Sequence, residues 1–287
     1  MKIGICLAGG GIKGAAHIGV LQALEEEKIQ INCISGTSSG SIVAALYSMG
    51  YTPKEILEMF REYGKEIGKI DWLIILKLIF GILFKRKLCI QGLNNRNKIC
   101  KLINQKAKLK KINLISDIKI PLIIPSVNLM DGSIYNFSSL NTKRSYSDDE
   151  KNISNVEIGK VVQASCAYPG VFYPTDINGK KFVDGGVREN IPWKELKNIG
   201  AEKIISISFN EIRKEKNKIN ILDNIINSMN IMMHELYNYE IEGIDFLLEI
   251  QTEDIGLLEF NKIDELYNIG YNTTKNNIKQ ILNYLYK

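Results

Sequence analysis

Two glycine-rich stretches, Gly9-Gly10-Gly11-Ile12-Lys13-Gly14 and Gly36-Thr37-Ser38-Ser39-Gly40, decide the fold of this chain. Each follows a short apolar run, residues 3–8 and 31–35, that is typical of a buried strand. Each also precedes a segment with apolar residues at helical spacing, which predicts a helix. Two successive strand–loop–helix units place free backbone N–H groups and the positive ends of two helix dipoles at the carboxyl edge of a parallel sheet.

The first glycine stretch fits two different kinds of site. Its spacing, Gly9-x-Gly11-x-x-Gly14, matches the fingerprint of dinucleotide-binding loops. That fingerprint also requires an acidic residue at the end of the second strand, and here this strand ends in Ile34-Ser35-Gly36. Cofactor binding is therefore the weaker interpretation of this loop.

Ser38 is the candidate nucleophile. The pattern Gly-x-Ser-x-Gly places it on a tight bend between a strand and a helix, where Gly36 and Gly40 leave room for a strained backbone. The N–H group after the serine and N–H groups of the first glycine loop can point at one oxyanion. This arrangement suits acyl transfer.

A nucleophilic serine needs a base, and the chain offers few candidates. It contains two histidines, His17 and His234. The order Ser38, Asp184, His234 mimics the triad of α/β-hydrolases, but that fold usually places several strands before its serine, and only two are predicted before Ser38. The other candidate is Asp184 itself, which ends a short strand and precedes Gly185-Gly186. An ordinary Asp-Gly turn is the structural alternative.

These motifs together resemble the patatin-like phospholipase family. Residues 9–14 followed by His17 are similar to the oxyanion loop of that family, and residues 36–40 are similar to its nucleophile motif. Asp184-Gly185-Gly186 is similar to its aspartate motif, and residues 164–174 resemble the segment before that aspartate. The motifs stand in the order of the family and span residues 3 to about 192.

The resemblance implies a three-layer α/β/α sandwich with a mainly parallel central sheet. It also implies a Ser–Asp dyad without a catalytic histidine, in which Ser38 is the nucleophile and Asp184 is the general base. The remaining site residues fall into oxyanion donors (Gly9, Gly10, Gly11 and Ser39) and supporting residues (Lys13, Gly14, Gly36, Gly40, Gly185 and Gly186). His17 matches a position of the family, so its presence requires no catalytic role.

The composition fits one large α/β domain spanning residues 1–287. The net charge of +5 is modest and spread along the chain, so it does not indicate nucleic-acid binding. Five cysteines without a C-x-x-C pair, and an N-terminal apolar run too short for a signal peptide, predict a cytoplasmic protein. No calcium loop or zinc ligand set is visible, so we expect neither a metal nor a cofactor. The oligomeric state stays open.

Residues 65–115 form a variable insert in this domain. Within it, residues 70–84 are apolar and Lys85-Arg86-Lys87 follow them. A bilayer span needs about 20 apolar residues. This run is shorter and carries Lys77, so we predict no transmembrane span. Three alternatives remain: a buried cap or core helix, a lid over the site, or a peripheral membrane contact through residues 70–87.

The other patterns predict secondary structure along the rest of the chain. We expect a strand pair over 120–137, an exposed polar loop over 138–155, a helix over 156–167, a strand over 203–209, a helix over 220–239, a strand over 244–250 and a closing helix over 262–286.

We therefore expect a serine acyl hydrolase acting on phospholipids or lysophospholipids, of phospholipase A or lysophospholipase type, as the resemblance implies. A soluble carboxylesterase or thioesterase on the same dyad is the alternative, favoured if residues 70–84 belong to the core. A non-catalytic nucleotide- or lipid-binding module would be favoured only if Ser38 and Asp184 lay far apart.

Overall fold

The computed structural model describes residues 1–67, 98–141, 150–210, 221–252, 255–256 and 259–287. Its strands are β1 (Ile3–Leu7), β2 (Cys33–Gly36), β3 (Leu122–Asn128), β4 (Ile134–Ser138), β5 (Glu150–Ile153), β6 (Thr175–Ile177), β7 (Lys180–Asp184), β8 (Lys203–Asn210) and β9 (Phe246–Gln251). The described helices are α1 (Gly14–Glu26), α2 (Ser39–Ser48), α3 (Pro53–Ile67), α5 (Lys98–Leu109), α6 (Ile158–Ser165), α7 (Trp193–Asn198), α8 (Ile221–Glu240) and α9 (Ile263–Tyr286). No helix among these residues is both long and apolar enough to cross a membrane.

The strands form one sheet in the order β5-β4-β3-β2-β1-β8-β9, with β7 paired to β3 and β6 paired to β7. The neighbours β3-β2-β1-β8-β9 are all parallel. The antiparallel pairs lie at the other side of the sheet, where β3 contacts β4 and β7. This confirms the mainly parallel central sheet.

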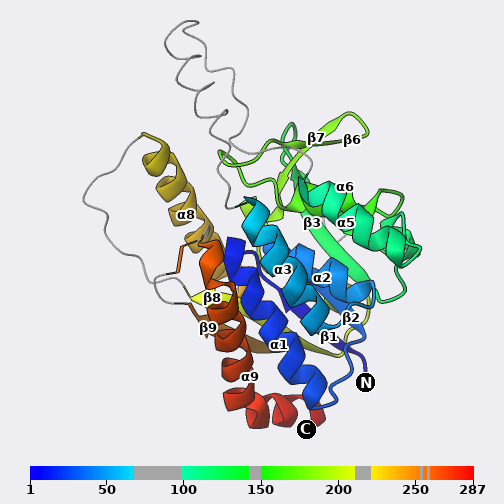
Figure 1. Cartoon of the computed structure of the whole chain (residues 1–287), viewed down its shortest axis with the longest axis vertical. Helices are drawn as coiled ribbons and strands as arrows, with labels where there is room; N and C mark the ends of the chain where they lie inside the picture. Colours follow the sequence, from blue (N-terminus) through cyan, green and yellow to red (C-terminus); the bar gives the residue numbers. More distant parts are fainter. Residues whose placement is uncertain (68–97, 142–149, 211–220, 253–254, 257–258) are drawn as a thin grey trace, which may run out of the picture.

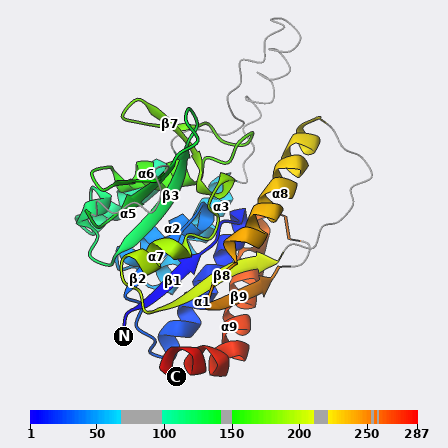
Figure 2. The same cartoon turned by 180° about the vertical axis from the view of Figure 1, so that it is seen from behind.

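Helices cover both faces of the sheet, with a larger hydrophobic core on one face than on the other. Helices α1, α2, α3 and α9 lie on the face seen in front in Figure 1 and build the larger hydrophobic core. Helix α7 and the C-terminal end of α8 lie on the opposite face, seen in Figure 2, around a smaller cluster that includes Trp193 and Leu196. The three-layer α/β/α arrangement is therefore confirmed, with one thick and one thin outer layer.

Two strands meet end to end along one edge of β3. Strand β2 pairs in parallel with the start of β3, where Ser35 lies opposite Ile123. Strand β7 pairs antiparallel with the end of β3, where Asp184 lies opposite Ser126. Pro125, which has no N–H group to donate, lies between the two pairings. Because β2 and β7 run toward this gap from opposite directions, their carboxyl ends converge there.

The expectation for residues 138–155 is wrong in its last part. Residues 150–153 form β5, which pairs in parallel with β4 at the edge of the sheet. The sequence of this strand, Glu-Lys-Asn-Ile, is mostly polar, so it lacks the apolar pattern from which a strand is predicted. The other predicted strands and helices are present, with shifts of a few residues at their ends.

The predicted insert over 65–115 begins in α3 and includes α5. Residues 70–87, for which the core, lid and membrane alternatives were considered, lie outside the described residues. These alternatives therefore stay predictions, and so does the single-domain organisation of the chain.

Helices α1 and α9 pack backbone against backbone. A methyl group added to Gly19 would lie 2.0 Å from the carbonyl oxygen of Tyr267, and one added to Gly270 would lie 2.0 Å from the carbonyl oxygen of Ala16. Each helix therefore places a glycine where its partner comes closest. This contact fixes α9 against the helix that follows the first glycine loop.

We predict that Gly270→Ala destabilises the protein by about 1–3 kcal/mol, because the added methyl group would force two helix backbones apart. In an exposed helix the same substitution is stabilising by about 0.5–1 kcal/mol. Urea unfolding followed by circular dichroism measures the difference. Asn276→Ala, at an exposed position of α9, is the control and should leave the protein as stable as the wild type or stabilise it by up to about 0.7 kcal/mol, as helix propensity predicts. A stabilised Gly270→Ala variant would refute the close contact.

Candidate active site

Ser38 lies at the bend between β2 and α2, in a backbone conformation that L-residues avoid. Its φ is 52° and its ψ is −123°, and such a conformation costs about 1–3 kcal/mol. A methyl group on Gly36 would lie 2.5 Å from the carbonyl oxygen of Gly40, and one on Gly40 would lie 2.3 Å from the carbonyl oxygen of Leu7. The two glycines are therefore required by close backbone contacts on both sides of the serine.

Three side chains hold the backbone of Ser38 in this conformation. Its N–H group donates to Ser165 Oγ at 3.1 Å. Its carbonyl oxygen accepts hydrogen bonds from Ser41 Oγ at 2.6 Å and from Cys166 Sγ at 3.2 Å. Ser165 and Cys166 belong to the stretch 164–174, whose place in the fold is thereby explained: the end of α6 packs beneath the serine.

The first glycine loop lies directly against this bend. A methyl group on Gly9 would lie 3.0 Å from Ser38 Cβ, and one on Gly14 would lie 2.7 Å from Ser39 Cβ. The two loops predicted to share a sheet edge are therefore in contact.

Several backbone N–H groups near Ser38 are available to a ligand. In the described part of the chain, the N–H groups of Gly10, Gly11 and Ser39 donate no hydrogen bond. Ser39 is the first residue of α2, so the positive end of that helix dipole lies beside Ser38. Gly9 differs from these three residues, because its N–H group donates to Asn190 Oδ1 at 3.0 Å.

Asp184 lies beside Ser38 and is 2% exposed. Its Oδ1 atom accepts a hydrogen bond from the Gly186 N–H group at 2.9 Å, whereas its buried Oδ2 atom has no hydrogen-bond partner. Burial raises the pKa of Asp184 from 3.8 to about 7, while the Gly186 N–H group and the Ser38 hydroxyl group act in the opposite direction. The hydroxyl group thus faces the carboxylate without a hydrogen bond of standard geometry, and such pairs often tighten only when substrate binds.

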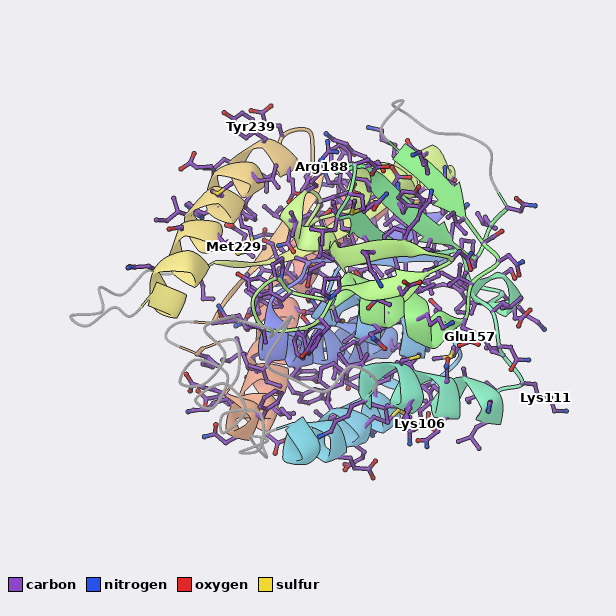
Figure 3. All side chains as sticks on the ribbon, turned by 90° about the horizontal axis from the view of Figure 1, so that it is seen from above. Lys106, Lys111, Glu157, Arg188, Met229 and Tyr239 are labelled. Carbon is purple, nitrogen blue, oxygen red and sulfur yellow. The ribbon has the colours of Figure 1, made fainter. Side chains whose placement is uncertain are left out.

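The two glycines after Asp184 allow its loop to approach the other motifs. A methyl group on Gly185 would lie 2.6 Å from the carbonyl oxygen of Pro125 and 3.1 Å from Thr37 Cγ2. Gly186 contacts Met233 of α8, because a methyl group there would lie 3.2 Å from the Met233 Cε atom. Figure 3 shows α8, with Met229 and Tyr239 labelled, beside the loop that carries Arg188.

The remaining candidates have other surroundings. Lys13 is buried at the start of α1. His17 is fully buried, its Nε2 atom bonds the Ala8 carbonyl oxygen at 2.8 Å, and burial lowers its pKa to about 4.

His234 is exposed on α8 and its ring stacks on Tyr237, so the structure does not bring it to the Asp184 carboxylate. In the described part of the chain, no three His, Cys, Asp or Glu side chains are grouped as metal ligands would be.

Sequence reasoning missed Asn190, whose side chain contacts the first glycine loop. The available signal was its position, four residues after Gly186 and directly before the buried Ile191-Pro192 pair. This position places Asn190 near the site, but the residue it bonds could not be read from the sequence.

Comparisons with known proteins add findings on the family, on sequence relatives and on the fold. A family model described as patatin-like phospholipase matches residues 5–197. The lysophospholipase NTE1 of Candida albicans is 24% identical over 295 residues, covering 93% of this chain and 19% of the relative. Its counterpart from Saccharomyces cerevisiae is 24% identical over 294 residues, covering 93% and 16%. The chain therefore spans between about a sixth and a fifth of the length of these curated relatives.

The crystal structure of VipD from Legionella pneumophila superposes on this chain with a TM-score of 0.54. The two are 16% identical, and the superposition covers 97% of this chain and 67% of VipD. At this identity the likeness shows a shared fold, which agrees with the three-layer architecture.

We predict that Asp184→Asn stabilises the protein at alkaline pH. The folded-state pKa of Asp184 is raised to about 7, so the unfolded state ionises first and the folded state is penalised increasingly between about pH 4 and pH 7. Above that range the variant should gain up to about 4 kcal/mol, and the gain should shrink at about pH 5. Thermal melts of the variant and the wild type at about pH 8.5 and about pH 5 measure this gain.

The matched control for this prediction is Asp176→Asn. Asp176 is exposed, and its hydrogen bond with Lys181 lowers its pKa, so its removal should not stabilise the protein. An Asp184→Asn variant no more stable than the wild type at about pH 8.5 would contradict the raised pKa.

Proposed function

This chain belongs to the patatin-like phospholipase family, and we propose that it hydrolyses carboxylic ester bonds of phospholipids or lysophospholipids. The observation that carries the proposal is the buried Asp184 carboxylate facing the strained Ser38. The curated relatives are named lysophospholipases, which supports a lipid ester as the substrate. The binding-module alternative would be favoured only if Ser38 and Asp184 lay far apart, and the Ser38 hydroxyl group beside the Asp184 carboxylate supports hydrolysis instead.

In the proposed reaction the Ser38 hydroxyl oxygen attacks the ester carbonyl carbon. Asp184 accepts the hydroxyl proton through Oδ2, the oxygen without a hydrogen-bond partner. A pKa of about 7 makes Asp184 a stronger base than an exposed aspartate and leaves much of it ionised at neutral pH. Burial therefore brings the pKa of Asp184 close to neutral pH, where a general base is most effective.

The N–H groups of Gly10, Gly11 and Ser39 would hold the negative oxygen that develops on the carbonyl group. Collapse of the tetrahedral intermediate returns the proton from Asp184 to the leaving alcohol and leaves an acyl group on Ser38. Water, deprotonated by Asp184, then releases the fatty acid and restores the hydroxyl group. Lys13, buried at the start of α1, adds positive charge beside the loop.

The same dyad could serve a soluble carboxylesterase or thioesterase, because it acts on the carbonyl group that all these substrates share. The substrate class therefore depends on what binds next to the dyad. A contact of residues 70–87 with a membrane would favour the lipid substrate, and this contact remains a proposal, as does the cytoplasmic location.

The test compares the wild type and three variants on a short-chain p-nitrophenyl ester and on phosphatidylcholine and lysophosphatidylcholine in mixed micelles. We predict that Ser38→Ala and Asp184→Asn lower kcat by at least about 10³-fold, because each removes a group that acts in the transition state. His234→Ala should keep kcat within about twofold, and a chelator should have no effect.

An equally inactive His234→Ala variant would replace the dyad with a triad. A wild type that cleaves the short ester but neither phosphatidylcholine nor lysophosphatidylcholine would favour the soluble esterase. A wild type inactive on all three substrates would refute the proposed function.

A further inference from the structure

The chain segment after the Asp184 loop ties the other two motifs together. The Thr37 hydroxyl group donates to the carbonyl oxygen of Glu189 at 3.0 Å. The Ser35 hydroxyl group donates to the carbonyl oxygen of Pro192 at 2.8 Å. Residues 189–192 therefore lie along the end of β2, with the two ends of the segment fixed to the strand that leads into the serine bend.

Asn190 lies in the middle of this segment and reaches the first glycine loop. Its Oδ1 atom accepts the N–H group of Gly9 at 3.0 Å. A methyl group on Gly9 would lie 2.6 Å from that oxygen, and one on Gly186 would lie 3.1 Å from it. The carboxamide oxygen thus fills a space that glycines leave open on both sides, between the oxyanion loop and the aspartate loop.

The backbone of Asn190 is itself anchored. Its N–H group donates to Glu240 Oε1 at 2.6 Å, at the end of α8. The carbonyl oxygen of the same Glu240 accepts a hydrogen bond from Trp193 Nε1 at 2.8 Å. The Asn190 side chain therefore projects from a backbone segment that hydrogen bonds hold in place. A side chain that positions another group needs such an anchor.

We propose that Asn190 is a positioning residue for the ester hydrolysis proposed above, on which this inference rests. By accepting the Gly9 N–H group, its carboxamide fixes the peptide plane between Ala8 and Gly9. Three consecutive glycines would otherwise sample many conformations. With the first one fixed, the free N–H groups of Gly10 and Gly11 are held in one orientation toward the oxyanion.

The value of this arrangement is preorganisation. Oxyanion donors are most effective when they need no reorientation as charge develops, and loss of one donor costs about 10²–10³ in rate. Asn190 does not need to touch the substrate for this effect. Its loss should therefore act on kcat and leave KM nearly unchanged.

The test is Asn190→Ala with a matched control, Asn32→Ala. Asn32 Oδ1 accepts the Ile3 N–H group at 2.8 Å, at the opposite end of the strand that leads into Gly9. We expect Asn190→Ala to lower kcat by about 10–100-fold and to change KM by less than about twofold. Asn32→Ala should keep kcat within about twofold of the wild type, even if it lowers the melting temperature as much as Asn190→Ala does.

Two further variants distinguish positioning from general destabilisation. Asn190→Asp keeps an acceptor for the Gly9 N–H group, so at about pH 9 its kcat should be at least about fivefold higher than that of Asn190→Ala. The added negative charge should raise the pKa of Asp184 and so move the acid limb of the pH profile to higher pH. The double variant Gly9→Ala/Asn190→Ala should be no less active than the worse single variant, because Asn190→Ala removes the oxygen that a methyl group on Gly9 would meet at 2.6 Å, while the close approach to Ser38 Cβ is the same in Gly9→Ala and in the double variant.

An unchanged kcat in Asn190→Ala, or a loss that appears in KM alone, would overturn this role while the proposed function stands. An Asn32→Ala variant as impaired in kcat as Asn190→Ala would overturn it too. A wild type without ester hydrolysis would instead refute the proposed function itself, and with it this inference.

Discussion

The burial of the Asp184 carboxylate next to Ser38 is the interaction on which the rest of the site depends. Removed from water, the carboxyl group keeps its proton up to about pH 7. Ionisation of Asp184 therefore lowers the stability of the folded protein, and in the proposed mechanism the raised pKa gives the dyad a base suited to neutral pH. Sheet topology produces this burial. Strands β2 and β7 stop short of each other along one edge of β3, so that the serine bend and the aspartate leave the sheet at the same gap.

A carboxylate is still a weak base for a hydroxyl group, so the proposed mechanism relies on what surrounds the dyad. The strained backbone of Ser38 is held by hydroxyl and thiol groups from α2 and the end of α6. The glycine loop lies close enough to the serine that a side chain on Gly9 would collide with it. Helix α2 starts directly after the serine and adds its dipole. In the proposed mechanism these features hold the N–H groups around Ser38 in place as oxyanion donors, which are most effective when they need no reorientation.

Much of this architecture could be predicted from the sequence, because its signals are local. Gly36 and Gly40 meet backbone requirements within a few residues of Ser38, and the apolar runs before the two glycine loops mark their strands. The features that were missed depend on distant contacts. Ser165, Cys166 and Asn190 bond residues that are 127 to 181 positions away in the chain, and no local pattern records such a partner. Strand β5 was missed for a related reason, since a polar strand at a sheet edge shows no apolar alternation. The residues around Asp184 made it a candidate base and the family resemblance supported that interpretation, but its raised pKa depends on burial that only the folded chain creates.

The most direct test of this account is the pH dependence of the rate at which a fluorophosphonate modifies Ser38, followed by mass spectrometry of the intact protein. The account predicts that the rate rises with pH to a plateau, with a midpoint near 7 that follows the pKa of Asp184. The same curve should be obtained for His234→Ala. A midpoint of about 4, the value of an exposed aspartate, or the loss of the acid limb when His234 is replaced, would contradict a buried Asp184 as the base.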